Sequence, residues 1–174
     1  MKKRIIALGL LWCLSAVMLQ AARVDTVLVR SAAMNKDVKV VYVLPDKAIG
    51  KQACPVVYLL HGYGGNARSW VQLKPELPQM ADEKGIIFVC PDGKNSWYWD
   101  SPENPAYRYE TFVTSELVKY TDGNYATIPD RKARAISGLS MGGHGALWSA
   151  IRHKDVFGAA GSMSGGVDIR PFPQ

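Results

Sequence analysis

The segment that most constrains the fold of this chain is GLSMG at residues 138–142, which matches the pattern G-x-S-x-G and contains Ser140. Residues 133–139 before it predict a strand, and residues 142–153 after it predict a helix. On such a strand-to-helix turn the serine Oγ projects from the end of a sheet. Glycines are required two residues to either side, because a Cβ there would collide with neighbouring backbone. The segment therefore predicts Ser140 as a nucleophile; a glycine-rich junction with an incidental serine is the alternative.

The rest of the chain supplies the strands and helices that this turn needs. Strands are predicted at residues 24–30, 38–44, 56–60, 86–90, 133–139 and 158–163. The first two, joined by a turn at residues 33–37, are expected to form a hairpin. From the third strand on, strands alternate with helical segments near residues 70–84, 110–120 and 142–153. This order predicts an α/β fold with a mostly parallel sheet and helices on both faces. Nothing marks a second domain, so residues 23–174 are expected to form one.

The N-terminus has the pattern of a signal peptide. A positive segment at residues 2–4 precedes an apolar run at residues 5–19, and Ala21 and Ala22 offer a cleavage point. The run is shorter than the roughly 20 residues of a membrane span. We expect residues 1–22 to be removed and the protein to be secreted or periplasmic, without stable membrane association. An uncleaved anchor is the alternative, because Leu19 and Gln20 make an imperfect cleavage context.

The net charge gives little support to a nucleic-acid partner. The formal charge is +6, from 21 basic and 15 acidic residues. Without the three basic residues of the leader, 18 basic and 15 acidic residues leave +3. No basic cluster of the kind that nucleic-acid binding needs remains.

Two cysteines lie beyond the leader, Cys54 just before one predicted strand and Cys90 at the end of the next. If these strands run parallel, the two residues lie at opposite ends of the sheet, about 16 Å apart, which is too far for a disulfide. We expect two buried, unpaired thiols.

A glycine-rich loop, HGYGG at residues 61–65, follows the third predicted strand. In folds with a G-x-S-x-G turn, this loop supplies one backbone N–H to the oxyanion of the reaction, and the residue after the nucleophile supplies the other. The predicted donors are Tyr63 and Met141. His61 is expected to brace the loop. A flexible turn without a role is the alternative.

A long aromatic loop after the fourth strand is the candidate for substrate contact. Trp97 and Trp99 present flat surfaces that stack on sugar rings or an aromatic acyl group, and Asp100 can bind hydroxyl groups. Packing beside the site is an equal alternative. Glu116 on the following helix is expected to be structural.

Several segments together resemble one family of enzymes. They are HGYGGN (61–66), PDGKNSWYWDSP (91–102), ETFVTSELVKY (110–120), GLSMGGHGALWSA (138–150) and SMSGG (162–166). The chain from residue 24 to 168 resembles the esterase D family of α/β-hydrolases, close to the secreted feruloyl and acetyl-xylan esterases of carbohydrate esterase family 1. The resemblance implies an α/β-hydrolase fold, ester hydrolysis through an acyl-enzyme, and no cofactor or metal. The implied substrate is an acylated plant polysaccharide or oligosaccharide.

The same resemblance implies a triad acid and a histidine after two further strands. No histidine follows His153 in this sequence. We therefore expect a C-terminally truncated chain that lacks the last two strands. His144, one helical turn after Ser140, is a weak substitute because the helix dipole disfavours the imidazolium that a base must become. Asp168 could orient a base or lie in a turn, and His153 is expected at a helix end. The alternatives to an ester hydrolase are an acyltransferase of mycolyl type, a thioesterase like S-formylglutathione hydrolase, and an inactive fragment that binds carbohydrate.

Overall fold

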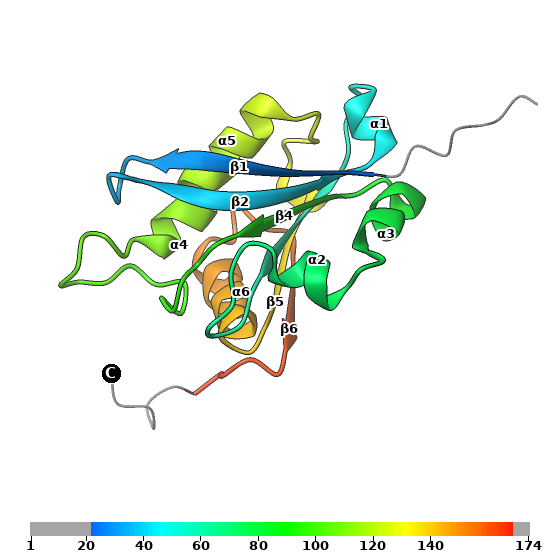
Figure 1. Ribbon diagram of the computed structural model, residues 1–174. Coiled ribbons are helices and arrows are strands. Elements are labelled where there is room, and N and C mark those ends of the chain that lie inside the picture. The colour runs from blue at the N-terminus through cyan, green and yellow to red at the C-terminus, as the bar shows by residue number, and fades with distance from the viewer. Residues whose placement is uncertain (1–21, 169–174) are drawn as a thin grey trace, which may run out of the picture.

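A six-stranded sheet forms the centre of the protein in the computed structural model, which describes residues 22–168 (Figure 1). The strands are β1 (Arg23–Ser31), β2 (Lys36–Leu44), β3 (Val56–Leu60), β4 (Ile87–Pro91), β5 (Arg134–Leu139) and β6 (Ala159–Met163). All six predicted strands are confirmed, with ends that differ by two residues or fewer.

The strands lie in the order β1-β2-β4-β3-β5-β6. β1 and β2 form the predicted antiparallel hairpin, and β2 pairs antiparallel with β4. The remaining pairs are parallel, with Val57 opposite both Phe88 and Ala135. The prediction of a mostly parallel sheet is therefore correct.

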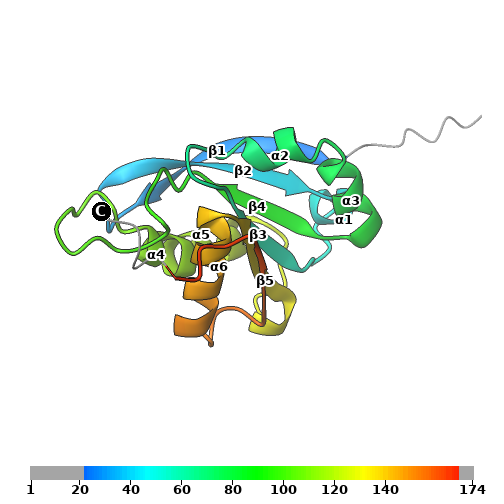
Figure 2. The same cartoon turned by 90° about the horizontal axis from the view of Figure 1, so that it is seen from below.

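Helices cover both faces of this sheet. They are α1 (Asp46–Ile49), α2 (Ser69–Leu73), α3 (Leu77–Lys84), α4 (Tyr109–Thr111), the π-helical turn η1 (Phe112–Glu116), α5 (Leu117–Asn124), the 3₁₀ turn η2 (Arg131–Ala133) and α6 (Met141–Arg152). Figure 2 shows α2 and α3 on one side and α4, α5 and α6 on the other. The chain moves from β3 to β4 in one direction along the sheet and from β4 to β5 and β6 in the other. Right-handed crossovers in opposite directions place their helices on opposite faces.

Local sequence accounts for most helix boundaries. The predicted helix at 70–84 is divided into α2 and α3, with Pro75 between them and Pro78 in the first turn of α3, where a missing N–H is tolerated. Gly85 ends α3 in the left-handed conformation, with φ 64°. Helix α1 forms a single turn in the connection between β2 and β3.

Each face of the sheet carries its own apolar core. Phe88, Leu59 and Leu77 belong to the core under α2 and α3, whereas Tyr58 and Phe112 belong to the core under α4 to α6. Cys54 and Cys90 are buried and free, as predicted.

The parallel arrangement brings four loops to one edge of the sheet. β3, β4, β5 and β6 run in the same direction, so the loops at 61–66 and 92–98, Ser140 and the segment at 164–166 follow the carboxyl ends of neighbouring strands. Ligands of open α/β sheets bind at such an edge, where successive crossovers diverge.

The predicted signal peptide falls almost entirely outside the described residues. Within residues 22–168, no helix has the length and apolar character needed to cross a membrane.

Candidate active site

Ser140 stands on a tight turn between β5 and α6. Its backbone has φ 54° and ψ −116°, a conformation that residues other than glycine adopt only under strain. The residue is exposed. A Cβ on Gly138 would lie 2.3 Å from the backbone of Gly142, and a Cβ on Gly142 would lie 2.2 Å from the Leu60 carbonyl oxygen. The strained, glycine-flanked turn that the sequence predicts at Ser140 is therefore present, and the role of Ser140 as nucleophile stays a prediction.

The end of β6 supports the same turn from the other side. The backbone N–H of Ser140 donates a hydrogen bond to the Met163 carbonyl at 2.9 Å. A Cβ on Gly165 would lie 2.8 Å from the Gly143 carbonyl carbon. The glycines of SMSGG thus let the segment after β6 pack against the first turn of α6.

The predicted oxyanion loop lies beside the serine. A Cβ on Gly62 would be 3.6 Å from the Ser140 Cβ, and Tyr63 is 66% exposed. Among residues 22–168, no protein acceptor is bonded to the backbone N–H of Tyr63 or of Met141. Both amides therefore keep the free donors that an oxyanion hole requires, and their assignment to that role stays a prediction.

His61 braces this loop, as expected. Its Nε2 accepts a hydrogen bond from the Gly93 N–H at 2.9 Å, so the ring proton is on Nδ1, which donates to the Gly62 carbonyl at 2.7 Å. The ring is buried. Because both nitrogens are bonded to backbone, His61 is not placed to take a proton from Ser140.

Asp92 fixes the start of the neighbouring loop. It accepts hydrogen bonds from the backbone N–H and the ammonium of Lys94, at 3.0 and 2.7 Å. Burial works against its ionisation, but the hydrogen bonds and the positive charge of Lys94 hold the pKa of this carboxyl well below its usual range.

His144 lies one helical turn after Ser140, but it is committed elsewhere. Its Nε2 accepts from the Trp99 indole N–H at 2.9 Å, and its Nδ1 lies 2.6 Å from the Gly166 carbonyl oxygen. The rings of Trp97, Trp99 and Trp148 surround it at centroid distances of 5.4 to 6.1 Å. His144 therefore ties the aromatic loop to α6 and to the segment after β6, and it is not oriented as a general base.

The aromatic loop folds down onto α6. Trp97 and Tyr98 both have positive φ, at 55° and 61°, and Tyr98 is completely buried. Its ring fills the space that a Cβ on Gly93 or Gly145 would need. Trp97 and Trp99 are half-buried, so packing is part of their role. Substrate contact by these two residues stays a prediction.

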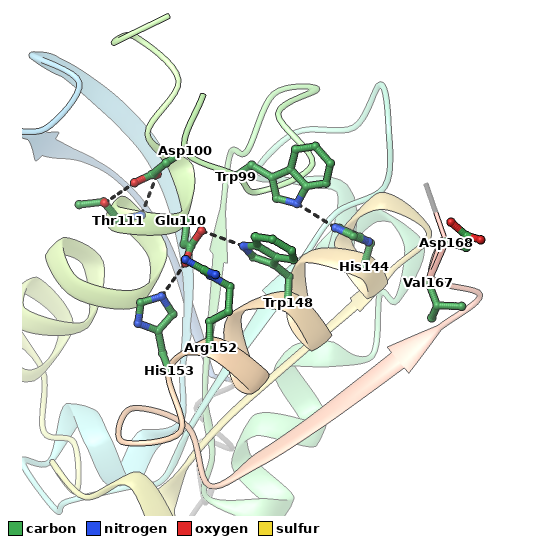
Figure 3. Close-up of a pocket in the computed structure, with 10 residues that line it drawn as sticks. All are labelled: Trp99, Asp100, Glu110, Thr111, His144, Trp148, Arg152, His153, Val167 and Asp168. Atoms are coloured by element: carbon green, nitrogen blue, oxygen red, sulfur yellow. Dashed lines mark hydrogen bonds and ion pairs between the residues drawn. The ribbon is translucent and has the colours of Figure 1, made fainter. Parts of the chain in front are cut away.

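A cavity of about 710 Å³ opens along α6 (Figure 3). Trp99, His144 and Trp148 line one part, and Asp168 lies at its edge. Ser140 is not among the lining residues. His144 lines the cavity and lies one helical turn after Ser140, so the cavity begins about one turn of α6 from the candidate nucleophile.

Glu110 organises the far end of this cavity, a role that the sequence did not reveal. It is 8% exposed and accepts hydrogen bonds from Trp148 Nε1, Arg152 Nε and His153 Nε2 at 2.7 to 2.8 Å (Figure 3). Burial alone would raise the pKa of this carboxyl, but the bonds from Arg152, Trp148 and His153 outweigh it and hold the pKa below the ordinary value. His153, expected at a helix end, is thus part of a clamp between α4 and α6.

Glu116, expected to be structural, binds the hairpin formed by β1 and β2. Its carboxylate accepts from the Ser31 hydroxyl at 2.6 Å and from the Ala33 N–H at 2.8 Å. Glu116 is the last residue of the π-helical turn η1, and Glu110 lies in α4 just before that turn.

Within the described residues, the site brings a candidate nucleophile and two candidate oxyanion donors together, but no histidine that could act as their base. All three histidines of the sequence lie in the described part of the chain, and each bonds to groups other than Ser140. Residues 22–168 also contain no group of three or more His, Cys, Asp or Glu that could hold a metal ion.

Fold and turn together define the α/β-hydrolase class: a mostly parallel sheet, a strained serine after a central strand, and a glycine-rich loop beside it. Comparison with known families identifies the family within this class. Residues 31–173 match the model of the Esterase family, described as "Putative esterase", and the chain belongs to that family.

Its relatives include hydrolases and acyltransferases. The chain is 28% identical over 135 residues to an acetyl esterase of Caldicellulosiruptor saccharolyticus, covering 73% of this chain and 50% of that protein. It is 34% identical over 155 residues to the diacylglycerol acyltransferase/mycolyltransferase Ag85A of Mycobacterium gordonae, covering 83% and 43%. A solved ferulic acid esterase superposes with a TM-score of 0.75 at 31% identity, covering 86% of this chain and 62% of that one. The chain thus spans about half the length of these curated relatives.

Proposed function

We propose that this protein is a serine carboxylic ester hydrolase that works through an acyl-enzyme on Ser140. The observation that carries the proposal is the strained, exposed serine at the start of α6, beside the glycine-rich loop at Gly62. Few other reasons exist for a chain to hold a serine in this conformation, because the strain costs about 1–3 kcal/mol.

In the proposed reaction, the Ser140 Oγ attacks the ester carbonyl and a bond forms between them. The carbonyl oxygen becomes an oxyanion, which the N–H groups of Tyr63 and Met141 stabilise. The N-terminus of α6 adds its positive dipole end at the same point. The alcohol then leaves with a proton, and water releases the acid from the acyl-serine.

The proton of Ser140 needs an acceptor that none of the three histidines provides. We propose that a histidine outside the 174 residues fulfils this role, oriented by an acid. The engagement of His61, His144 and His153 in other hydrogen bonds supports this. Losing triad members costs about 10⁴- to 10⁶-fold in rate, so the base decides whether activity is measurable.

For the substrate we propose feruloyl or acetyl esters of plant polysaccharides, or of oligosaccharides released from them. In this proposal Trp97 and Trp99 contact the substrate, and the reaction uses no cofactor. The resemblance to an acetyl esterase and a ferulic acid esterase supports this choice. Acyl transfer is the second candidate, supported by the likeness to a mycolyltransferase. Export through residues 1–22 is part of the same proposal.

The test compares hydrolysis of p-nitrophenyl acetate and methyl ferulate by the 174-residue chain and by the longest product of its gene. Ser140→Ala serves as the blank for both. We expect hydrolysis that this substitution removes, and the longer product to be the faster one. Added glycerol or a disaccharide that diverts the acyl group into a new ester would favour the transferase. If neither protein hydrolyses either ester, or if Ser140→Ala changes nothing, the esterase proposal is wrong.

A further inference from the structure

The predicted oxyanion loop, residues 61–66, is held by the loop that follows β4. Three hydrogen bonds join the two loops: Gly93 N–H to His61 Nε2 at 2.9 Å, Gly64 N–H to Asn95 Oδ1 at 2.8 Å, and Tyr98 Oη to the His61 carbonyl at 3.3 Å. Two of these anchor the buried start of the loop. The bond from Asn95 is the one that reaches its exposed tip.

The tip is a β-turn whose central residues are Tyr63 and Gly64. The Gly65 N–H closes it on the Gly62 carbonyl at 3.0 Å. Gly64 has φ 76°, the value of the third residue in a type II turn. Type I and type II turns differ by a flip of the peptide between the two central residues. The observed type II turn therefore differs from a type I turn in the direction of the Gly64 N–H.

Both peptides that flank Tyr63 are fixed by side chains. His61 Nδ1 holds the carbonyl of Gly62, and the trans peptide then directs the Tyr63 N–H to the opposite side. Asn95 Oδ1 holds the N–H of Gly64. Packing does not help, because nothing lies within 4 Å of a Cβ position on Gly64.

We propose that Asn95 is a positioning residue of the oxyanion hole: it anchors the exposed tip of the loop at Gly64 and so keeps the adjacent Tyr63 N–H, which His61 orients, in place beside Ser140. The inference rests on the function proposed above. Asn95 touches neither the nucleophile nor the reacting atoms; it acts through the backbone of the loop. Its own position is set by the turn at Lys94, which has φ 50° and is bonded to Asp92.

The test uses phenylboronic acid, whose boron bonds to a serine Oγ and becomes tetrahedral, placing an oxygen where the oxyanion would lie. Formation of this adduct is an equilibrium, so it can be measured on the 174-residue chain by ¹¹B NMR. Asn95→Leu keeps a side chain of similar size but removes the acceptor. Asn104→Leu is the matched control, because Asn104 Oδ1 also accepts a backbone N–H, from Ala106, in an exposed loop.

We expect Asn95→Leu to weaken the adduct about 10- to 100-fold, somewhat less than the loss of a whole oxyanion donor, while the melting temperature stays that of the unchanged chain. Asn104→Leu should leave adduct affinity unchanged. Hydrogen exchange at the Gly64 amide should speed up in Asn95→Leu and return toward the original rate in Asn95→Asp, which restores the acceptor.

Two results would overturn the inference, and they are distinguishable. If Asn95→Leu binds the boronate as tightly as the unchanged chain, Asn95 does not position the oxyanion hole, although Ser140 remains the nucleophile. If neither the 174-residue chain nor the longest product of its gene forms an adduct that Ser140→Ala removes, the proposed function fails and the positioning role fails with it.

Discussion

The strain at Ser140 gives a stability prediction that does not depend on any substrate. With φ 54° and ψ −116°, the residue is held in a conformation that costs a non-glycine residue about 1–3 kcal/mol. Ser140→Gly relieves this strain, whereas Ser140→Ala keeps it. Glycine also increases the entropy of the unfolded chain, at a cost of about 0.5–1 kcal/mol relative to alanine. The glycine variant should therefore be more stable than the alanine variant by about 0.5–2 kcal/mol.

The two variants are compared by urea unfolding and by thermal melts followed by circular dichroism. For a domain of this size, 1 kcal/mol shifts the melting temperature by about 2–4 °C, so the glycine variant should melt about 1–8 °C higher. Ser115 is the matched control, because it lies in η1 without a positive φ. There glycine should be less stable than alanine by about 1 kcal/mol. If glycine is no better than alanine at position 140, the backbone is not strained there and the argument for a dedicated nucleophile turn is refuted.

Three further outcomes follow from the packing and charges. Gly142→Ala should lower the free energy of unfolding, measured in urea, by about 1–3 kcal/mol, because the new Cβ would lie 2.2 Å from the end of β3. Gly123→Ala is the control: nothing lies within 4 Å of its Cβ position, so this substitution should stabilise the protein. Glu110→Gln should cost about 1.5–3 kcal/mol at pH 7 by weakening charged hydrogen bonds such as that from Arg152. The pKa of Glu110 is lowered in the folded state. Its contribution to stability is therefore present above about pH 4.3, the unfolded value, and is lost as the pH falls through the folded pKa. A difference in free energy of unfolding between the two proteins that stays constant from pH 7 to pH 3 would contradict this. Burial raises the pKa of the Cys90 thiol, so mass spectrometry should find it unmodified by Ellman's reagent until the chain is unfolded.

The strands and the nucleophile turn could be predicted because their signals are local. Apolar β-branched segments such as residues 38–44 specify strands directly, and the glycines around Ser140 are explained by distances within a few residues. The position of the oxyanion loop followed from the order of the strands, because parallel strands bring their carboxyl ends together.

The side-chain contacts between elements could not be predicted in the same way. Glu110 lies 38 to 43 positions from the three side chains that it binds, Trp148, Arg152 and His153, and no sequence periodicity predicts such a pairing. Asn95 had one usable signal: it lies in a turn-rich segment after a strand parallel to the one that ends at Leu60. For His144, helical spacing correctly placed it near Ser140 but could not show that both ring nitrogens bind elsewhere.

The measurement that tests the central claim most directly is the site of acylation. The 174-residue chain and the longest product of its gene are treated with p-nitrophenyl acetate, quenched in acid, digested and analysed by mass spectrometry. The nucleophile assignment predicts an acetyl group on Ser140 and its loss in Ser140→Ala. The proposed base outside the 174 residues predicts that the group appears faster in the longer product. Acetylation at another residue that tracks with hydrolysis, or hydrolysis that persists without Ser140, would contradict it.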